Sequence, residues 1–276
     1  MLFSFWLRKK AQKPTPPTRF RPRLETLDDR LVPSTLTVTN AADSLINGSF
    51  APGSLRQEIA AAQSGDTITF DKSLKGQTIT LNGSVGELYI AKNLDIEGLG
   101  AKNLAISGAG SRLFEVAANV QVTLAGMTIE NGDGQFSSNG VGWDSSDGQG
   151  GGILNFGALT VRGCTLSNNS ASNGGGGIAN EFGGTLTISG STVSHNFSYF
   201  QGGIVEFGGG GIYNDGTMTL SGSSVTQNSG GGIFNDYSGV LTILSSTVKS
   251  NHYEPDLYTL GTWSADSSST IGTVGP

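Results

Sequence analysis

The chain has 276 residues, of which 43 are glycine and only 14% are charged, so its length allows one or two ordinary domains or one array of repeats. Residues 1–30 carry eight basic and three acidic side chains, a net charge of +5, whereas residues 31–276 carry eight basic and nineteen acidic ones, a net charge of −11. This acidic body disfavours a nucleic-acid partner, because it lacks a basic stripe for phosphates, and no apolar run approaches the about 20 residues of a transmembrane helix.

The N-terminal segment, residues 1–35, is basic and rich in proline and arginine. Such a composition favours an extended or disordered chain over a packed domain. Its terminal position and positive charge suit an export or sorting arm.

Residues 36–64 are expected to form an N-terminal cap. The alternation in 35–39 predicts a strand, and Ser54-Leu55-Arg56-Gln57 predicts a capping box that opens a short helix to about Gln63. This helix places Leu55 and Ile59 on one face. We expect it to cover the first rung of a repeat array, where apolar interior and strand edges would otherwise be exposed.

Residues 65–251 alternate short strand patterns with glycine-rich corners. Eight strands are predicted before the repeats begin: 67–70, 78–81, 88–90, 94–96, 104–106, 114–116, 120–124 and 127–129. Four copies of one pattern follow, each with a glycine run, an isoleucine and an asparagine; the isoleucines are Ile153, Ile178, Ile212 and Ile233. A repeat of 21 to 34 residues built from short strands is typical of a solenoid.

Each copy continues with a strand whose apolar residues lie two positions apart and point inward, while Thr160, Thr187, Thr219 and Thr242 point out. A third short strand completes each copy. Three walls per turn predict an all-β fold, a right-handed parallel β-helix, with residues 252–276 as a C-terminal cap or tail.

Two sets of asparagines recur at fixed positions of the repeat. Stacked in successive rungs, their amides can hydrogen-bond along the axis as structural ladders, and this interpretation outweighs a role as ligands. The sets are Asn155, Asn180, Asn214 and Asn235, and Asn169, Asn196, Asn228 and Asn251. The single cysteine, Cys164, occupies a position that is serine in the other copies and is interpreted as a core filler.

Several segments resemble known bacterial surface proteins. Gly53-Ser54-Leu55-Arg56-Gln57-Glu58-Ile59, Gly65-Asp66-Thr67-Ile68-Thr69-Phe70 and Gly126-Met127-Thr128-Ile129-Glu130-Asn131-Gly132 resemble the "CSLREA"-type surface family. The glycine-started copies are similar to repeats of polymorphic outer-membrane proteins, and residues 23–34 look like an N-terminal sequence of exported planctomycete-type proteins. The resemblance implies a β-helix that is extracellular or associated with the cell surface or outer membrane; it implies no reaction.

An enzyme must still be considered, because parallel β-helices also include pectate lyases and polygalacturonases. Such chemistry needs clustered carboxylates or a basic side chain on one exposed wall. Arg112 and Arg162 are isolated in the sequence, and His195 and His252 have no obvious carboxylate in register. No catalytic residue is assigned, and a polysaccharide lyase or glycoside hydrolase is kept as the alternative function.

The best acidic cluster is Glu181, Asp215 and Asp236, each directly after a ladder asparagine. In register, these carboxylates would lie about one rung, or about 4.8 Å, apart. No cofactor is expected from the sequence, and these residues are interpreted as solvated corner carboxylates. Calcium is kept as the alternative, although three carboxylates fall short of its usual ligand number.

Two long insertions, residues 132–149 and 197–208, leave the same corner of the predicted solenoid and contain several aromatic side chains. Insertions on one face of a repeat protein often form its binding surface, and exposed rings can stack on sugars or contact a protein. The candidate ligand-binding residues are Phe136, Trp143, Phe197, Tyr199, Phe200 and Phe207. The leading hypothesis is an exported structural or adhesive module that binds a polysaccharide or a surface protein.

Overall fold

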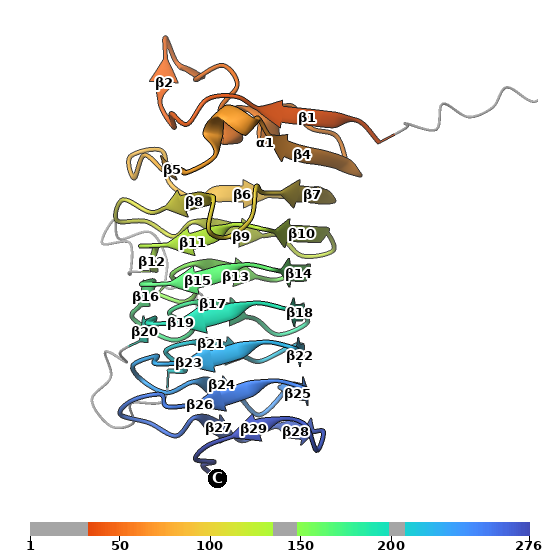
Figure 1. Ribbon diagram of the computed structural model, residues 1–276, viewed down its shortest axis with the longest axis vertical. Helices are drawn as coiled ribbons and strands as arrows, with labels where there is room; N and C mark the ends of the chain where they lie inside the picture. The colour runs from red at the N-terminus through yellow and green to blue at the C-terminus, as the bar shows by residue number, and fades with distance from the viewer. Residues whose placement is uncertain (1–32, 135–147, 199–207) are drawn as a thin grey trace, which may run out of the picture. The chain divides into compact units, whose positions relative to one another are not determined.

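The computed structural model describes residues 33–134, 148–198 and 208–276 (Figure 1). The chain divides into two units, residues 1–32 and 33–276, and the description below concerns the second. This unit consists of three long parallel sheets, one short parallel sheet, a hairpin and one α-helix. The predicted all-β class and parallel β-helix are confirmed.

The N-terminal end contains the only α-helix of the described residues, α1 (Leu55–Ala61). The Ser54 side chain caps it by accepting a hydrogen bond from the Gln57 amide, and Leu55 and Ile59 are buried in the core. The hairpin of β2 (Leu45–Ile46) and β3 (Ser49–Phe50) precedes this helix. Among the described residues, no helix is long and apolar enough to cross a membrane.

Each long sheet takes at most one strand from each turn of the solenoid, and all pairings within it are parallel. The nine-stranded sheet contains β1 (Thr35–Val38), β4 (Asp66–Phe70), β7 (Leu94–Glu97), β10 (Gln121–Ala125), β14 (Ala158–Arg162), β18 (Thr185–Ser189), β22 (Thr217–Ser221), β25 (Val240–Leu244) and β28 (Thr262–Ala265).

The eight-stranded sheet follows it in each turn, and the seven-stranded sheet precedes it. The former contains β5 (Gln77–Thr80), β8 (Leu104–Ser107), β11 (Thr128–Glu130), β15 (Thr165–Ser167), β19 (Thr192–Ser194), β23 (Ser224–Thr226), β26 (Thr247–Lys249) and β29 (Thr270–Ile271). The latter contains β6 (Leu88–Ile90), β9 (Phe114–Val116), β13 (Ile153–Asn155), β17 (Ile178–Asn180), β21 (Ile212–Asn214), β24 (Ile233–Asn235) and β27 (Leu257–Thr259).

The structure adds three features to the predicted three walls. A short fourth sheet joins β12 (Asp133–Gly134), β16 (Ser170–Ala171) and β20 (Phe197–Ser198), and one 3₁₀ turn, η1, spans Lys72–Leu74. The sheets also extend beyond residues 65–251, because β1 pairs with β4 and β28 pairs with β25. Segments that the sequence suggested as caps therefore contribute rungs as well.

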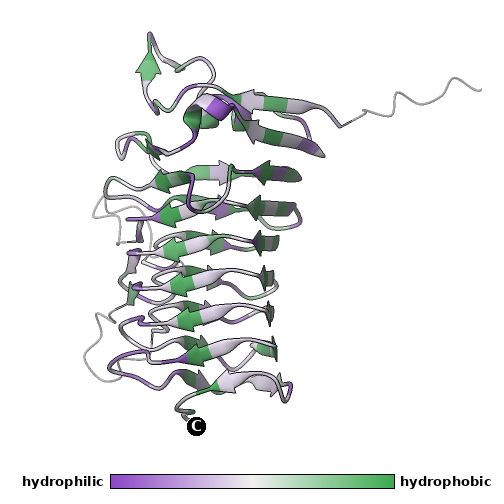
Figure 2. Ribbon diagram, viewed as in Figure 1, coloured by the Kyte–Doolittle hydropathy of each residue, from purple (hydrophilic) through white to green (hydrophobic). Residues whose placement is uncertain are grey.

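The core is a set of apolar columns that run along the solenoid axis (Figure 2). In the nine-stranded sheet, Leu159, Leu186, Met218 and Leu241 lie in register and are buried. Burial of one such side chain contributes about 1.5 to 3 kcal/mol relative to exposure. Repeats of different length still stack because the extra residues lie between the strands.

The eight repeat asparagines form two continuous hydrogen-bonded ladders. In the first, each amide donates to the next side-chain oxygen at 2.7 Å, and the series ends on the Thr259 hydroxyl at 3.1 Å. In the second, the corresponding distances are 2.9 to 3.0 Å, and the last amide, Asn251, donates to Asp256 at 2.8 Å. The ladders satisfy buried amides that would otherwise destabilise the core.

Cys164 begins a third stack. Its backbone amide donates to the Ser191 hydroxyl, and the same bond recurs from Ser191 to Ser223 and from Ser223 to Ser246. Burial raises the pKa of the Cys164 thiol. The stack and the burial of the thiol both agree with the interpretation of Cys164 as a core residue at a position that is serine in the other repeats.

Candidate functional site

The corner between the seven-stranded and nine-stranded sheets changes length from rung to rung. From the ladder asparagine to the next strand it spans three positions after Asn155 and Asn214, but five after Asn180 and Asn235. Long corners therefore project on either side of the short corner that follows Asn214. We call this edge the aromatic corner and define it by Phe156, Phe182 and Tyr237.

Both long corners carry an aromatic side chain at the tip of a turn. The Gly184 amide donates to the Glu181 carbonyl, which closes a four-residue turn around Phe182, and the positive φ of Gly183, 81°, suits the third position of that turn. The corresponding turn around Tyr237 is closed by Gly239. Phe182 and Tyr237 are 75% and 78% exposed and lie two rungs apart, or about 9.6 Å at the usual strand spacing.

The short corner at Phe156 lies in an open depression of about 530 Å³. Gly157 lets this corner pack closely against the preceding rung, because a Cβ atom at this position would clash with the carbonyl oxygens of Ala117 and Val120. Phe156 and Phe182 line the depression together with polar side chains of the neighbouring rungs; the polar ones are Asn93, Asn119, Gln121 and Thr185.

Amide groups occupy the N-terminal wall of this depression. The Asn93 side chain accepts a hydrogen bond from the Gln121 backbone amide at 2.8 Å, which fixes its orientation. Asn119 has a φ of 63°, a left-handed conformation that asparagine tolerates better than most residues. Aromatic faces beside amide donors and acceptors are suited to polar ring-shaped ligands such as sugars.

The next short corner contains an acidic group. The Tyr213 hydroxyl donates to Asp236 at 2.7 Å, and burial raises the pKa of Tyr213. Burial, followed by the nearby Asp236 charge, raises the pKa of the Asp215 carboxyl. Glu181 and Asp215 also act electrostatically on Tyr213, so the three predicted acidic residues gather around one tyrosine.

The three acidic residues were predicted to form a calcium site. Among the described residues, no group of three or more His, Cys, Asp or Glu side chains is arranged to hold a metal ion. Asp236 instead accepts the Tyr213 hydroxyl and the Tyr237 amide. In this structure Asp236 is therefore bonded to the protein, and calcium binding at Glu181, Asp215 and Asp236 stays a prediction.

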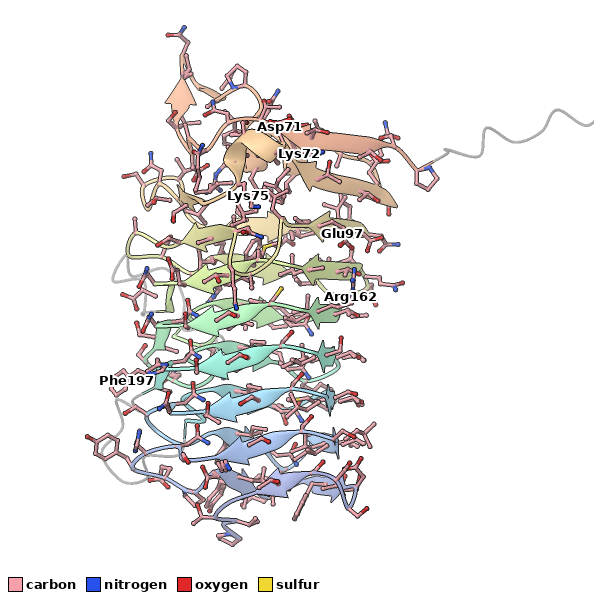
Figure 3. The ribbon with its side chains drawn as sticks, in the orientation of Figure 1. Asp71, Lys72, Lys75, Glu97, Arg162 and Phe197 are labelled. Carbon is pink, nitrogen blue, oxygen red and sulfur yellow. The ribbon has the colours of Figure 1, made fainter. Side chains whose placement is uncertain are left out.

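Of the six aromatic residues predicted to bind a ligand, only Phe197 is described; Phe136, Trp143, Tyr199, Phe200 and Phe207 lie outside the described residues. Phe197 belongs to β20 and is 42% exposed. Figure 3 shows its side chain on the opposite side of the solenoid from Arg162. Phe197 is not part of the aromatic corner, because β20 lies between the eight-stranded and seven-stranded sheets along the chain.

The two arginines that appear isolated in the sequence are paired in the structure. Arg112 contacts Glu87 at 2.9 Å and Glu115 at 3.2 Å, and Arg162 contacts Glu97 at 2.8 Å (Figure 3). The expectation of isolation is wrong because partners up to 65 positions away in sequence come into reach through stacking.

Sequence reasoning missed Phe156 and Phe182. Both follow a ladder asparagine closely, and the corner of Phe182 is two residues longer than that of Phe156. The difference in corner length can be read from the sequence. The depression also depends on which rungs become neighbours when the solenoid folds.

The fold defines the class of protein as a right-handed parallel β-helix. The chain belongs to the family described as right handed beta helix region, whose match covers residues 78–271. Among solved structures, pectin methylesterase PemA from Erwinia chrysanthemi is similar, with 15% sequence identity, a TM-score of 0.44, and coverage of 82% of this chain and 69% of that chain. A comparison with curated proteins found no match.

Proposed function

We propose that this protein is an exported, extracellular or surface-associated β-helix that binds a glycan at the aromatic corner. The observation that carries the proposal is the depression, where Phe156 and Phe182 lie beside the amides of Asn93, Asn119 and Gln121. Aromatic rings supply apolar faces for sugar rings, and amides supply donors and acceptors for sugar hydroxyls.

The acidic side chains of the corner favour an uncharged glycan over an acidic one as the ligand. Glu181, Asp215 and Asp236 lie along the same edge, and the body of the chain has a net charge of −11 over residues 31–276. A polyuronate would meet like charges here, which disfavours its binding. Neutral sugars meet no such penalty.

The test measures soluble oligosaccharide binding by calorimetry with the full chain and with Phe182→Ala combined with Phe156→Ala. Each lost ring is expected to cost about 1 kcal/mol, so the double variant should bind roughly 30-fold more weakly. The control is Tyr253→Ala, which removes an 87% exposed ring elsewhere. Unchanged affinity in the double variant, with intact β-sheet circular dichroism, would contradict the proposal.

A second candidate function, cleavage of a polysaccharide, is favoured by one observation. A carboxyl with a raised pKa, such as that of Asp215 beside Asp236, can act as a general acid. The same protein is therefore incubated with a polysaccharide panel, with and without calcium, and assayed for new reducing or unsaturated ends. Release that Asp215→Asn abolishes would establish the enzyme; no release leaves a binding module.

A further inference from the structure

The outward face of the nine-stranded sheet carries a column of threonine side chains. In the central outward position, Thr123, Thr160, Thr187, Thr219 and Thr242 follow one another in register over five consecutive strands, and Ser264 continues them. They are therefore spaced by about 4.8 Å along the axis. Figure 1 shows these strands stacked above one another from β10 to β28.

The C-terminal part of this face is uncharged. None of the outward positions of the four described strands β18, β22, β25 and β28 carries an acid or a base, although the protein has 22 acidic residues. These positions hold Thr185, Thr187, Ser189, Thr217, Thr219, Ser221, Val240, Thr242, Leu244, Thr262 and Ser264. Depletion of charge over a contiguous patch is typical of the core of a binding surface.

A threonine array has two properties that suit an ordered ligand. Each side chain offers a hydroxyl, which both donates and accepts, beside a methyl group for apolar contact. Its β-branch also restricts rotation about χ1, so little side-chain entropy is lost on binding. A rigid face of this kind matches a ligand surface that repeats along one axis.

The face is continuous with the aromatic corner. Gln121, Ala158 and Thr185 line the depression and are also the first outward positions of β10, β14 and β18. A glycan held at the corner can therefore extend over the threonine column. One sugar ring of an extended neutral chain has a length close to the rung spacing, so successive rings can meet successive threonines.

We propose that the outward face of β18, β22 and β25, together with Thr160 of β14, binds the surface of an ordered, insoluble, neutral polysaccharide. This inference rests on the proposed function, because both assume that the ligand is a neutral glycan. It assigns a different binding surface, and the ligand is a solid instead of a soluble oligosaccharide. The rows of hydroxyl groups on such a polysaccharide are both the donors and the acceptors that the threonines require.

The experiment measures depletion of the full chain from solution by microcrystalline cellulose and by chitin powder. The test variant is Thr160→Val, Thr187→Val and Thr219→Val together, which keeps shape and strand preference and removes only hydroxyls. The matched control removes three hydroxyls from the outward face of the eight-stranded sheet, through Thr165→Val, Thr192→Val and Thr247→Val.

We expect the protein to bind one of the two solids, the test variant to lose at least about tenfold in affinity, and the control to retain wild-type binding. Equal binding by both variants, or no binding of the wild type to either solid, would overturn the inference. Binding to ice crystals in place of both polysaccharides would also overturn it, because the array would then recognise ordered water.

The proposals for the two surfaces can be contradicted independently of each other. If soluble oligosaccharides bind at the corner but neither solid depletes the protein, the proposed function stands and the inference falls. If the threonine variant loses binding to a solid while the wild type binds no soluble oligosaccharide, the inference stands and the proposed site at the corner falls.

Discussion

At the scale of single residues, buried amides connect one rung to the next. Asn180 is fully buried, donates to Asn214 at 2.7 Å and accepts from Asn155 at 2.7 Å. A leucine has nearly the same shape but can do neither. The Asn214 oxygen and the carbonyl groups near Asn180 would then lose a donor in the core.

We therefore predict that Asn180→Leu lowers the free energy of unfolding by at least about 2 kcal/mol. Urea unfolding followed by circular dichroism measures this change. Thr185→Ala on the adjacent strand, where the side chain is exposed, is the control and should change stability by less than about 1 kcal/mol. An unchanged free energy of unfolding in Asn180→Leu would show that the ladder contributes no stability.

At the scale of elements, a buried ion pair joins helix α1 to the segment that precedes the hairpin, and its arginine also bonds to the solenoid. Arg56 contacts Asp43 through two 2.7 Å bonds and also donates to the carbonyl oxygens of Gly86 and Glu87. The Asp43 side chain is only 4% exposed. Removing the arginine leaves that carboxylate buried without its counter-charge.

Arg56→Ala is predicted to destabilise the protein by about 3 to 5 kcal/mol, whereas Arg56→Met with Asp43→Leu should lose much less. The matched control is Arg162→Ala, which breaks an ion pair whose side chains are 57% and 37% exposed and should cost about 1 kcal/mol or less. Chemical denaturation of all three variants checks the order. A double variant less stable than Arg56→Ala would contradict it.

At the scale of the whole molecule, hydrogen-bonded carboxylates lie in the first and last turns of the solenoid. The Ser269 hydroxyl and the Ser245 amide lower the pKa of Asp266 from 3.8 to about 2. Backbone amides of Gln63 and Ser34 lower the pKa of Asp66. Burial would raise the pKa of Asp256, but hydrogen bonds from Asn251 and Thr273 outweigh it and lower that pKa as well.

These shifts set the sign of the pH dependence. A carboxyl whose pKa is lower in the folded state stabilises the fold above its unfolded pKa and loses this contribution as the pH falls through the folded value. Stability should therefore be nearly constant from pH 7 to about 5 and fall between about pH 4 and 2. Asp266→Asn should be less stable at pH 7 and lose less on acidification.

Urea unfolding at several pH values measures this effect. The exposed Asp95, changed to Asn on the outward face of β7, is the comparison variant. Identical pH dependence in wild type and Asp266→Asn would show that this carboxylate does not contribute to acid sensitivity.

The sequence by itself determined the solenoid, because period-two strands, glycine corners and register asparagines are local patterns that repeat. It indicated the helix at Leu55 and the outward threonines for the same reason. Only the tertiary structure decided which rungs flank Phe156, and that Arg112 reaches Glu87 and Arg162 reaches Glu97. Those features depend on neighbours that are about 25 to 65 positions apart in sequence and become adjacent only when the rungs stack.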